Sequence, residues 1–315
     1  MTIFSKSIVI MSAPGSKAVH NNAMRIGISL PHFRHLASRE AIRRIAQYAE
    51  GLGLDSIWVS DHILLTDVQT KRFGSVFYEP IATLSYAAAM TEKIRVGTTA
   101  IILPYRNPKV TAKQLSTIDA LSGGRLIFGC AAGWSQEEFE ALGVDFKTRG
   151  AVSDTYLRII KRLWTEPLVD GMHFEPRPVQ KPLPPIWIGG NSKRGIRRAV
   201  EFGDCWHPTR PSADEIRAGK AHISEIAGGH GRKPHEIGIT VREPFKIDEG
   251  LPAERNRPFI GPRAHVMDSF HEFKELGVNH MVVDLFYSAS VLEDATLDSM
   301  IQAMEVLARD ICPRL

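Results

Sequence analysis

Short runs of β-branched and aliphatic residues alternate along the chain with longer segments in which apolar residues recur every three or four positions. The short runs predict buried strands and the longer segments predict amphipathic helices, because side chains on one helix face recur at that spacing. From Met24 onward this alternation repeats eight times. The predicted strands cover residues 25–30, 56–60, 94–103, 125–130, 185–189, 205–208, 237–242 and 280–286.

A predicted helix follows each strand. The first begins at Ser38, carries its apolar residues on one stripe and ends at Gly53. The second covers residues 79–90, the fifth follows Asn191 and the sixth follows Pro211. Apolar residues at helical spacing mark the third, fourth, seventh and eighth helices: Leu115, Ile118 and Leu121; Leu157, Ile160 and Leu163; Val266, Phe270 and Phe273; Leu297, Met300, Ile301 and Met304.

Eight successive βα units predict a closed (β/α)₈ TIM-like barrel that forms one domain over residues 24–315. An open doubly wound sheet usually has a glycine-rich fingerprint after its first strand, where this chain has Pro31-His32-Phe33. Two connections are unusually long, residues 134–152, with a helical piece at 137–142, and residues 244–263. We expect both to be inserted loops beside the C-terminal face of the strands. Residues 1–23 are expected to form a loosely ordered N-terminal extension.

Composition narrows the class of protein. With 43% hydrophobic and 23% charged residues, the chain has the composition of a soluble globule. A net charge of +4 without a concentrated basic run favours a small-molecule ligand over nucleic acid. The three cysteines lie far apart, which fits a reducing, cytoplasmic setting and predicts neither a disulfide framework nor a metal site. No apolar run approaches the roughly 20 residues that cross a bilayer.

Barrel enzymes carry their active sites at the C-terminal ends of the strands, so these positions hold the candidate functional residues. These ends supply His32, Asp61, His62, residues 98–103, residues 132–135, residues 189–192, His207, Glu243 and Asp284. The adjacent Asp61 and His62 can serve proton transfer, because imidazole titrates near neutrality. Alternatively, Asp61 caps a turn and His62 is a partly exposed histidine at the barrel rim.

Two glycine-containing stretches can each be interpreted in two ways. Gly97 lies within a predicted strand, where it either lets a ligand ring approach or forms a bulge that shapes the barrel. Gly189 and Gly190 precede a predicted helix that Asn191 or Ser192 can cap. The free N–H groups of that helix could hold a phosphate, or the turn could be a solvated basic first turn.

Several longer stretches resemble one family. The run LPYRNPKVTAKQLSTIDALSGGRLIFG, residues 103–129, is the strongest match, and WVSDH, PIWIGGNS and ELGVNHMVV follow the same order and intervals. Over residues 24–313 the chain therefore resembles the bacterial luciferase-like monooxygenases, in particular their deazaflavin (coenzyme F420)-dependent branch. This resemblance implies a TIM-like barrel, a flavin or deazaflavin cofactor, and either hydride transfer or flavin-dependent oxygenation.

Carried over residue by residue, the resemblance implies that Asp61 and His62 are catalytic and lie beside the cofactor ring, with His62 handling the proton. It also implies a cis peptide between Thr99 and Ala100 that supports the ring. The other implied cofactor contacts are Gly133 and Trp134 beyond the fourth strand, and Gly189, Gly190 and Ser192 at the phosphate.

Two departures from the family pattern bear on the choice of cofactor and substrate. Sugar-phosphate dehydrogenases of the F420 branch carry a glutamate where this chain has Trp134, and a tryptophan suits a more apolar or planar substrate. Flavin-dependent members more often show two histidines after the acid, whereas Ile63 follows His62 here. This difference favours F420 over FMN.

Three functional hypotheses remain open at this point. The first is an F420-dependent oxidoreductase acting on a small organic substrate. The second is an FMN-dependent monooxygenase that works with a separate reductase, and the third is a non-catalytic flavin-binding barrel. The resemblance also implies a homodimer.

Overall fold

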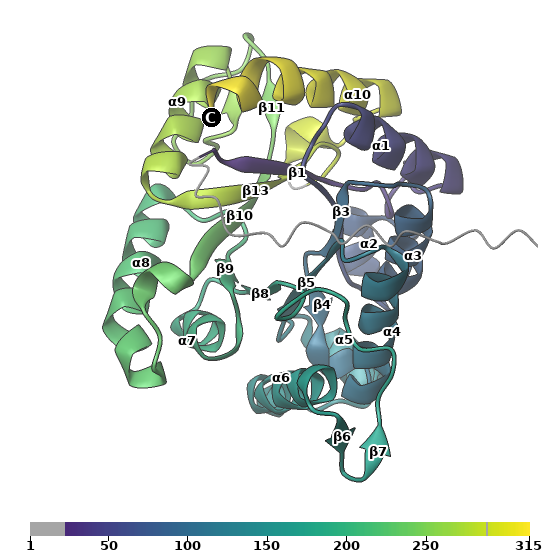
Figure 1. Ribbon diagram of the computed structural model, residues 1–315. Coiled ribbons are helices and arrows are strands. Elements are labelled where there is room, and N and C mark those ends of the chain that lie inside the picture. Colours follow the sequence, from purple (N-terminus) through teal and green to yellow (C-terminus); the bar gives the residue numbers. More distant parts are fainter. Residues whose placement is uncertain (1–22, 288) are drawn as a thin grey trace, which may run out of the picture.

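The computed structural model describes residues 23–287 and 289–315. Its main feature is a closed barrel of parallel strands surrounded by helices (Figure 1). The predicted extension lies outside the described residues, apart from residue 23. The strands of the barrel are β1 (Arg25–Ser29), β2 (Ser56–Val59), β3 (Arg95–Thr98), β4 (Ile101–Ile102), β5 (Leu126–Ala131), β8 (Ile186–Gly189), β9 (Cys205–His207), β10 (Gly238–Pro244) and β13 (Val278–Asp284).

The strand order is β3-β2-β1-β13-β10-β9-β8-β5-β4, and β3 also pairs with β5, which closes the ring. The predicted (β/α)₈ barrel is therefore confirmed. The third predicted strand was wrong in one respect, because residues 94–103 form two pieces, β3 and β4, that are separated at Thr99–Ala100. That interruption lies at the C-terminal end of the barrel, where the strand ends converge.

The eight predicted helices are all present: α1 (Arg39–Gly51), α3 (Pro80–Ala89), α4 (Pro108–Leu121), α6 (Arg149–Thr165), α7 (Lys193–Phe202), α8 (Ala213–Ile226), α9 (Arg263–Glu275) and α10 (Leu297–Val306). Ser38, Ser192 and Ser212 cap α1, α7 and α8 with their side chains. Leu121, expected on an apolar stripe, is 85% exposed because it ends its helix. None of the helices among the described residues has the length and apolar character needed to span a membrane.

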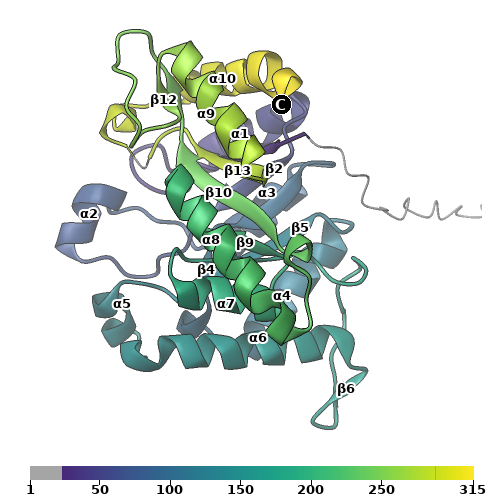
Figure 2. The same cartoon turned by 90° about the vertical axis from the view of Figure 1, so that its left-hand side faces the viewer.

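The inserted segments have more structure than their sequence predicted. The 134–152 connection contains α5 (Gln136–Ala141), within one residue of the helical piece expected there. In the 244–263 connection, β11 (Lys246–Ile247) pairs in parallel with β12 (Ile260–Gly261). Neither α2 (Asp67–Phe73) nor the hairpin of β6 (Leu168–Val169) and β7 (Met172–His173) was predicted. Figure 2 shows α2 and α5 on the same side of the molecule, and Gln69 of α2 donates to Ser135, the N-cap of α5.

The barrel interior is filled by aromatic rings. Trp58 of β2 stacks on Trp187 of β8 at a centroid distance of 4.6 Å, although these strands are not neighbours, so both rings lie inside the barrel. A Cβ atom at Gly97 would lie 2.4 Å from Cζ3 of Trp58. Gly97 therefore makes room for a core tryptophan, which neither interpretation of this glycine anticipated.

Candidate functional site

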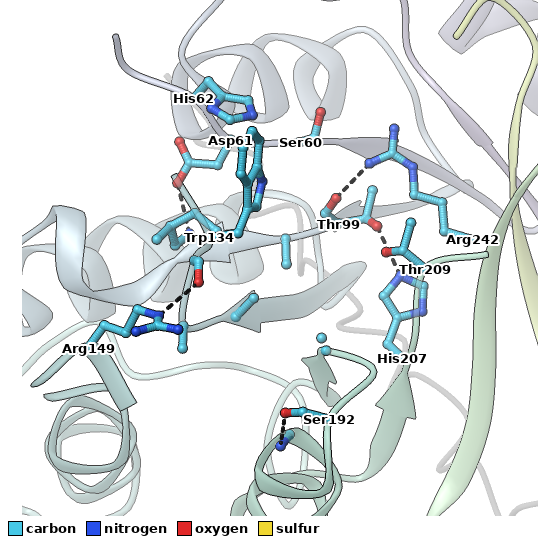
Figure 3. A pocket seen from close by; sticks show the side chains of 18 of the residues that line it. Ser60, Asp61, His62, Thr99, Trp134, Arg149, Ser192, His207, Thr209 and Arg242 are labelled. Carbon is cyan, nitrogen blue, oxygen red and sulfur yellow. Dashed lines mark hydrogen bonds between the residues drawn. The ribbon is translucent and has the colours of Figure 1, made fainter. Parts of the chain in front are cut away.

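A cavity of about 690 Å³ opens at the C-terminal ends of the strands, and Figure 3 shows its main side chains. This volume lies within the range of small-molecule and cofactor sites. Its lining brings together the nine site residues that the resemblance implied: Asp61, His62, Thr99, Ala100, Gly133, Trp134, Gly189, Gly190 and Ser192. Of the other strand-end candidates, His207 also lines it, whereas His32, Glu243 and Asp284 do not.

His62 follows β2 and is held by a buried carboxylate on α5. Its Nδ1 lies 2.7 Å from Oε2 of Glu138, whose other oxygen accepts the backbone N–H groups of Ile63 at 2.5 Å and Leu64 at 3.0 Å. The hydroxyl of Tyr105 donates to Oε2 at 3.0 Å. Burial favours a raised pKa for Glu138, but the hydrogen bonds from His62 and the two backbone N–H groups outweigh it and lower that pKa. An ionised Glu138 orients the imidazole so that Nδ1 donates, which leaves Nε2 for a ligand.

Three aromatic rings surround His62. Its ring centroid lies 4.8 Å from Phe73, 5.3 Å from Phe77 and 5.6 Å from Trp134. Trp134 is 56% exposed although it borders the cavity, so its ring stands at the opening rather than in the core. The imidazole therefore faces an apolar part of the cavity that suits an uncharged or planar group.

Asp61 precedes His62 in the chain, but its side chain has different hydrogen-bond partners. Its Oδ2 accepts the backbone N–H of Ile102 at 2.9 Å, and both carboxylate oxygens pair with Arg106. Burial raises the pKa of Asp61, whereas Arg106 acts in the opposite direction. These partners occupy both carboxylate oxygens, a geometry that suits a positioning residue which fixes the ends of β2 and β4.

The predicted cis peptide between Thr99 and Ala100 is confirmed. The carbonyl of Thr99 accepts a hydrogen bond from Arg242 at 2.9 Å, and the Thr99 hydroxyl lies 2.9 Å from Nε2 of His207. Arg242 in turn forms a buried ion pair with Asp284. Burial, assisted by the nearby Arg242, lowers the pKa of His207 to about 3, so this histidine is neutral at physiological pH. These contacts fix the inner wall of the cavity.

The opposite end of the cavity contains small residues and a helix N-terminus. A Cβ atom at Gly189 would lie 3.3 Å from that of Ala131 and 3.7 Å from that of Ala100, so this surface is closely packed. Ser192 caps α7 by accepting from Gly195 N–H at 3.3 Å, as the sequence allowed. Figure 3 places Ser192 across the cavity from His62. The small side chains leave space for a flat ring, and the helix end suits an anionic group.

Cationic side chains reinforce that end of the cavity. Arg149 donates to the carbonyls of Gly133 and Phe146 at 3.2 and 2.8 Å, and no carboxylate of the described residues pairs with it. Arg194 also lines the cavity, whereas Arg198 is paired with Asp154. Within the described ranges, no three His, Cys, Asp or Glu side chains are grouped in a way that could hold a metal ion.

Sequence reasoning missed several residues that shape the site. Tyr105 and Arg106 lie in the LPYRNP stretch on which the family resemblance rests, so their position could have suggested a role. Glu138 follows its N-cap Ser135 by three residues, the ordinary place for an acid in a helix's first turn, and nothing in that spacing indicates a contact with His62. Arg242 is the last residue of the predicted strand 237–242, so the strand-end rule could have pointed to it, whereas Arg149 carried no recognisable sequence signal.

Comparisons with known proteins show what the chain is similar to. Residues 24–251 match the family model for luciferase-like monooxygenase. The FMNH2-dependent dimethylsulfone monooxygenase of Pseudomonas putida is 29% identical over 216 residues, which cover 63% of this chain and 56% of that protein. The matched part thus spans little more than half of that relative.

Solved structures show the same fold. The monooxygenase RslO1 from Streptomyces bottropensis superposes with a TM-score of 0.75 at 19% identity, covering 92% of this chain and 99% of that one. An F420-dependent secondary alcohol dehydrogenase in complex with an F420-acetone adduct gives a TM-score of 0.72 at 15% identity, covering 89% and 98%. The fold is thus similar to that of an F420-dependent enzyme, whereas the curated relative from Pseudomonas putida is FMNH2-dependent.

Proposed function

We propose that this chain, which belongs to the luciferase-like monooxygenase family, is an oxidoreductase. It would bind coenzyme F420 and transfer a hydride between F420 and a small organic substrate. The observation that carries the proposal is that His62, oriented by Glu138, borders the same cavity as the Gly189-Gly190 turn and the start of α7. A proton-handling group and an anion-binding helix end are thus combined in one cavity.

The residues present fit such a cofactor. Ala100, Ala131 and Gly189 form a closely packed surface without long side chains, on which a planar tricyclic ring could lie. The N-terminus of α7, with Arg149 and Arg194 nearby on the cavity wall, suits the phosphate of its tail. Such a deazaflavin, when bound, supplies a two-electron hydride carrier that reacts poorly with oxygen.

Within this scheme His62 donates or accepts the substrate's proton. Glu138 holds Nδ1–H, so the proton moves at Nε2, toward the substrate oxygen when a carbonyl is reduced and from the hydroxyl when an alcohol is oxidised. Phe73, Phe77 and Trp134 exclude water around the imidazole. The carboxylate of Asp61 is bound to Arg106, which fixes the end of β2. Because His62 is the next residue in the chain, this also keeps His62 in place.

An FMN-dependent monooxygenase is the second candidate, supported by the similarity to the FMNH2-dependent dimethylsulfone monooxygenase. The purified protein should be titrated with oxidised F420 and, separately, with FMN, following the absorbance of each cofactor. We expect saturable binding of F420. Tight binding of FMN without binding of F420, together with oxygen consumption in the presence of reduced FMN, would exclude the F420 proposal in favour of the second.

The assembly and setting of the enzyme are proposed from the same family membership. We expect a cytoplasmic homodimer whose cofactor is reduced by a separate F420 or flavin reductase. Sedimentation velocity of the purified chain tests the dimer, and a single species of about 35 kDa, the mass of one chain, would contradict it.

A further inference from the structure

A second cavity, of about 410 Å³, is lined in part by the inserted 244–263 segment. Its other walls come from the connections after β9 and β13 and from the end of β10. Among the described residues, Arg210 is the one that lines both this cavity and the first. The second cavity is large enough for a small organic molecule.

The two cavities lie on opposite sides of β10. Arg242 lines the first cavity, where Figure 3 shows it, and Glu243 lines the second. These two residues are consecutive on one strand, and successive side chains of a strand point to opposite faces. The second cavity is therefore separated by the barrel wall from the space that contains His62.

Glu243 brings a buried carboxyl group to the wall of the second cavity. The residue is 2% exposed, and its Oε1 has no hydrogen-bond partner among the described residues. Two other described side chains have such an atom, Ser29 and Tyr86, and neither lines either of the two cavities. A buried oxygen without a partner costs free energy, so its position in a cavity wall indicates a place for a hydrogen-bond donor.

The surroundings of Glu243 favour its neutral form. Burial raises the pKa of its carboxyl group well above the ordinary 4.5. Arg210 acts in the opposite direction, whereas Asp284 and Glu215 add to the rise. A neutral carboxylic acid has an O–H donor and a carbonyl acceptor side by side.

The charges of the cavity wall narrow the class of ligand. Arg255 and Arg257, which are exposed on the inserted segment, line the cavity together with Arg210, so a cation is disfavoured. An anion would be drawn to the exposed arginines and would leave the buried Oε1 of Glu243 without a donor. A neutral group with an N–H next to a carbonyl complements both oxygens of the acid. Apolar surfaces for the body of such a molecule are also present: Pro211, Pro244, Pro258, Phe259 and Ile260.

We propose that the cavity lined by Glu243 is a second binding site, which takes a small neutral molecule with a carboxamide or lactam group. The N–H of that group donates to Oε1, and its carbonyl accepts the O–H of the acid. The site goes beyond the proposed function, because it lies across β10 from the first cavity and does not depend on which cofactor binds there.

The test measures binding to the full chain by ligand-observed NMR. Two pairs of probes are titrated separately: 2-piperidinone with N-methyl-2-piperidinone, and benzamide with N,N-dimethylbenzamide. In each pair, methylation removes the N–H and keeps the carbonyl. We expect at least one parent compound to bind about 10-fold more tightly than its methylated partner, because the methylated compound leaves the buried oxygen unpaired.

Variants of Glu243 locate the site and identify its chemistry. Glu243→Leu removes both hydrogen-bonding atoms and should reduce the parent compound to the affinity of its methylated partner. Glu243→Gln should retain the preference, because a side-chain amide also offers an acceptor next to a donor. Glu275→Leu is the control, since Glu275 is exposed at the end of α9.

Thermal unfolding of each variant identifies loss of fold. Glu243→Asp, whose carboxyl group is drawn back by one methylene, replaces a leucine variant that does not fold and should weaken the preference. The proposal is overturned if neither parent compound binds more tightly than its methylated partner, or if the preference survives in Glu243→Leu. Loss of the preference in Glu243→Gln as well would assign binding to a charged carboxylate and overturn the neutral pairing.

A competition experiment separates this site from the first cavity. The preferred probe is titrated again in the presence of F420 or FMN, whichever the protein binds. Unchanged probe affinity would support a separate site, whereas displacement of the probe would place it in the first cavity and overturn the proposal. A probe that depends on Glu243 in a protein that binds neither cofactor would support the second site while refuting the proposed function.

Discussion

Nδ1 of His62 lies 2.7 Å from Oε2 of Glu138, so a residue at a barrel strand end is bound to a residue of the inserted helix α5. The same carboxylate accepts the backbone N–H groups of Ile63 and Leu64. The inserted segment therefore does more than cover the cavity: it fixes the direction of the imidazole and the path of the chain that follows it.

Replacing Glu138 by Gln should lower turnover about 10- to 100-fold while His62 remains present, because an amide fixes the imidazole tautomer less strongly and carries no charge. We expect kcat to fall more than KM changes, and the pH profile of kcat to shift. Glu140→Gln is the matched control, since Glu140 is exposed on the same helix and bonds only Gln136 among the described residues. Equal effects of the two substitutions would contradict a positioning role.

Replacing His62 by Ala should reduce turnover by about 10² or more if the imidazole transfers the proton. Cofactor affinity should change little, because the phosphate end of the cavity lies across from His62 (Figure 3). Single-turnover kinetics together with cofactor titration measure the two effects. His271→Ala on the outer helix α9 should affect neither. A His62 variant with unchanged turnover would favour a non-catalytic flavin-binding barrel.

The fold was largely predictable because each βα unit carries its own signal. Strand runs such as residues 56–60 and helix caps such as Ser38 can be recognised from neighbouring residues alone. The order of the strands and helices along the chain then implies a closed barrel. The split between β3 and β4 was not predictable from strand pattern, since the residues on both sides of it are equally apolar or small.

Contacts between residues far apart in the sequence could not be predicted from local sequence patterns. Gly97 and Trp58 are 39 positions apart, and only their pairing on neighbouring strands shows why glycine is needed there. The contact of Glu138 with His62 likewise depends on how α5 folds back over β2. Arg34, in the loop after β1, and Arg72, in α2, line one cavity, and no residue pattern specified that they would meet. Most of the predicted residues end strands, whereas Glu138 and Arg149 reach the site from the inserted 134–152 segment and Arg106 from the turn after β4.

Asp61→Asn should lower the free energy of unfolding by about 3 kcal/mol, because it leaves the mostly buried Arg106 without its principal counter-charge. Chemical denaturation monitored by tryptophan fluorescence measures this loss. Glu79→Gln removes the more exposed partner of Arg106 and should cost less than about 1 kcal/mol. If Asp61→Asn left stability intact but abolished turnover, a direct catalytic role would replace the positioning role.

Stability should fall on mild acidification because of three buried histidines. The ordinary pKa of histidine is 6.5. Mainly through burial, the pKa of His32 is lowered to about 4 and the pKa values of His207 and His280 are lowered to about 3. Between pH 6.5 and about 4 the unfolded chain therefore binds more protons than the folded one, and folding weakens as pH falls.

Because each of these histidines is half protonated at pH 6.5 in the unfolded chain, each costs about 1 kcal/mol between pH 6.5 and pH 5.5, and together they cost about 3 kcal/mol. Urea unfolding at a series of pH values measures the slope. His280→Asn should remove about a third of it, and His271→Asn, at an exposed position of α9, should not change it. A flat stability profile between pH 7 and 5.5 would contradict the neutral, buried state of these side chains.

Gly97→Ala should destabilise the barrel by about 1–3 kcal/mol, because the added Cβ atom would lie 2.4 Å from Cζ3 of Trp58 and the ring, stacked on Trp187, cannot move aside freely. Thermal and urea unfolding both measure this loss. Gly51→Ala is the matched control, since a Cβ atom there meets nothing within 4 Å and alanine suits the helix α1 better than glycine. Equal stability of the two variants would mean that the barrel interior is less tightly packed around Trp58 than the structure shows.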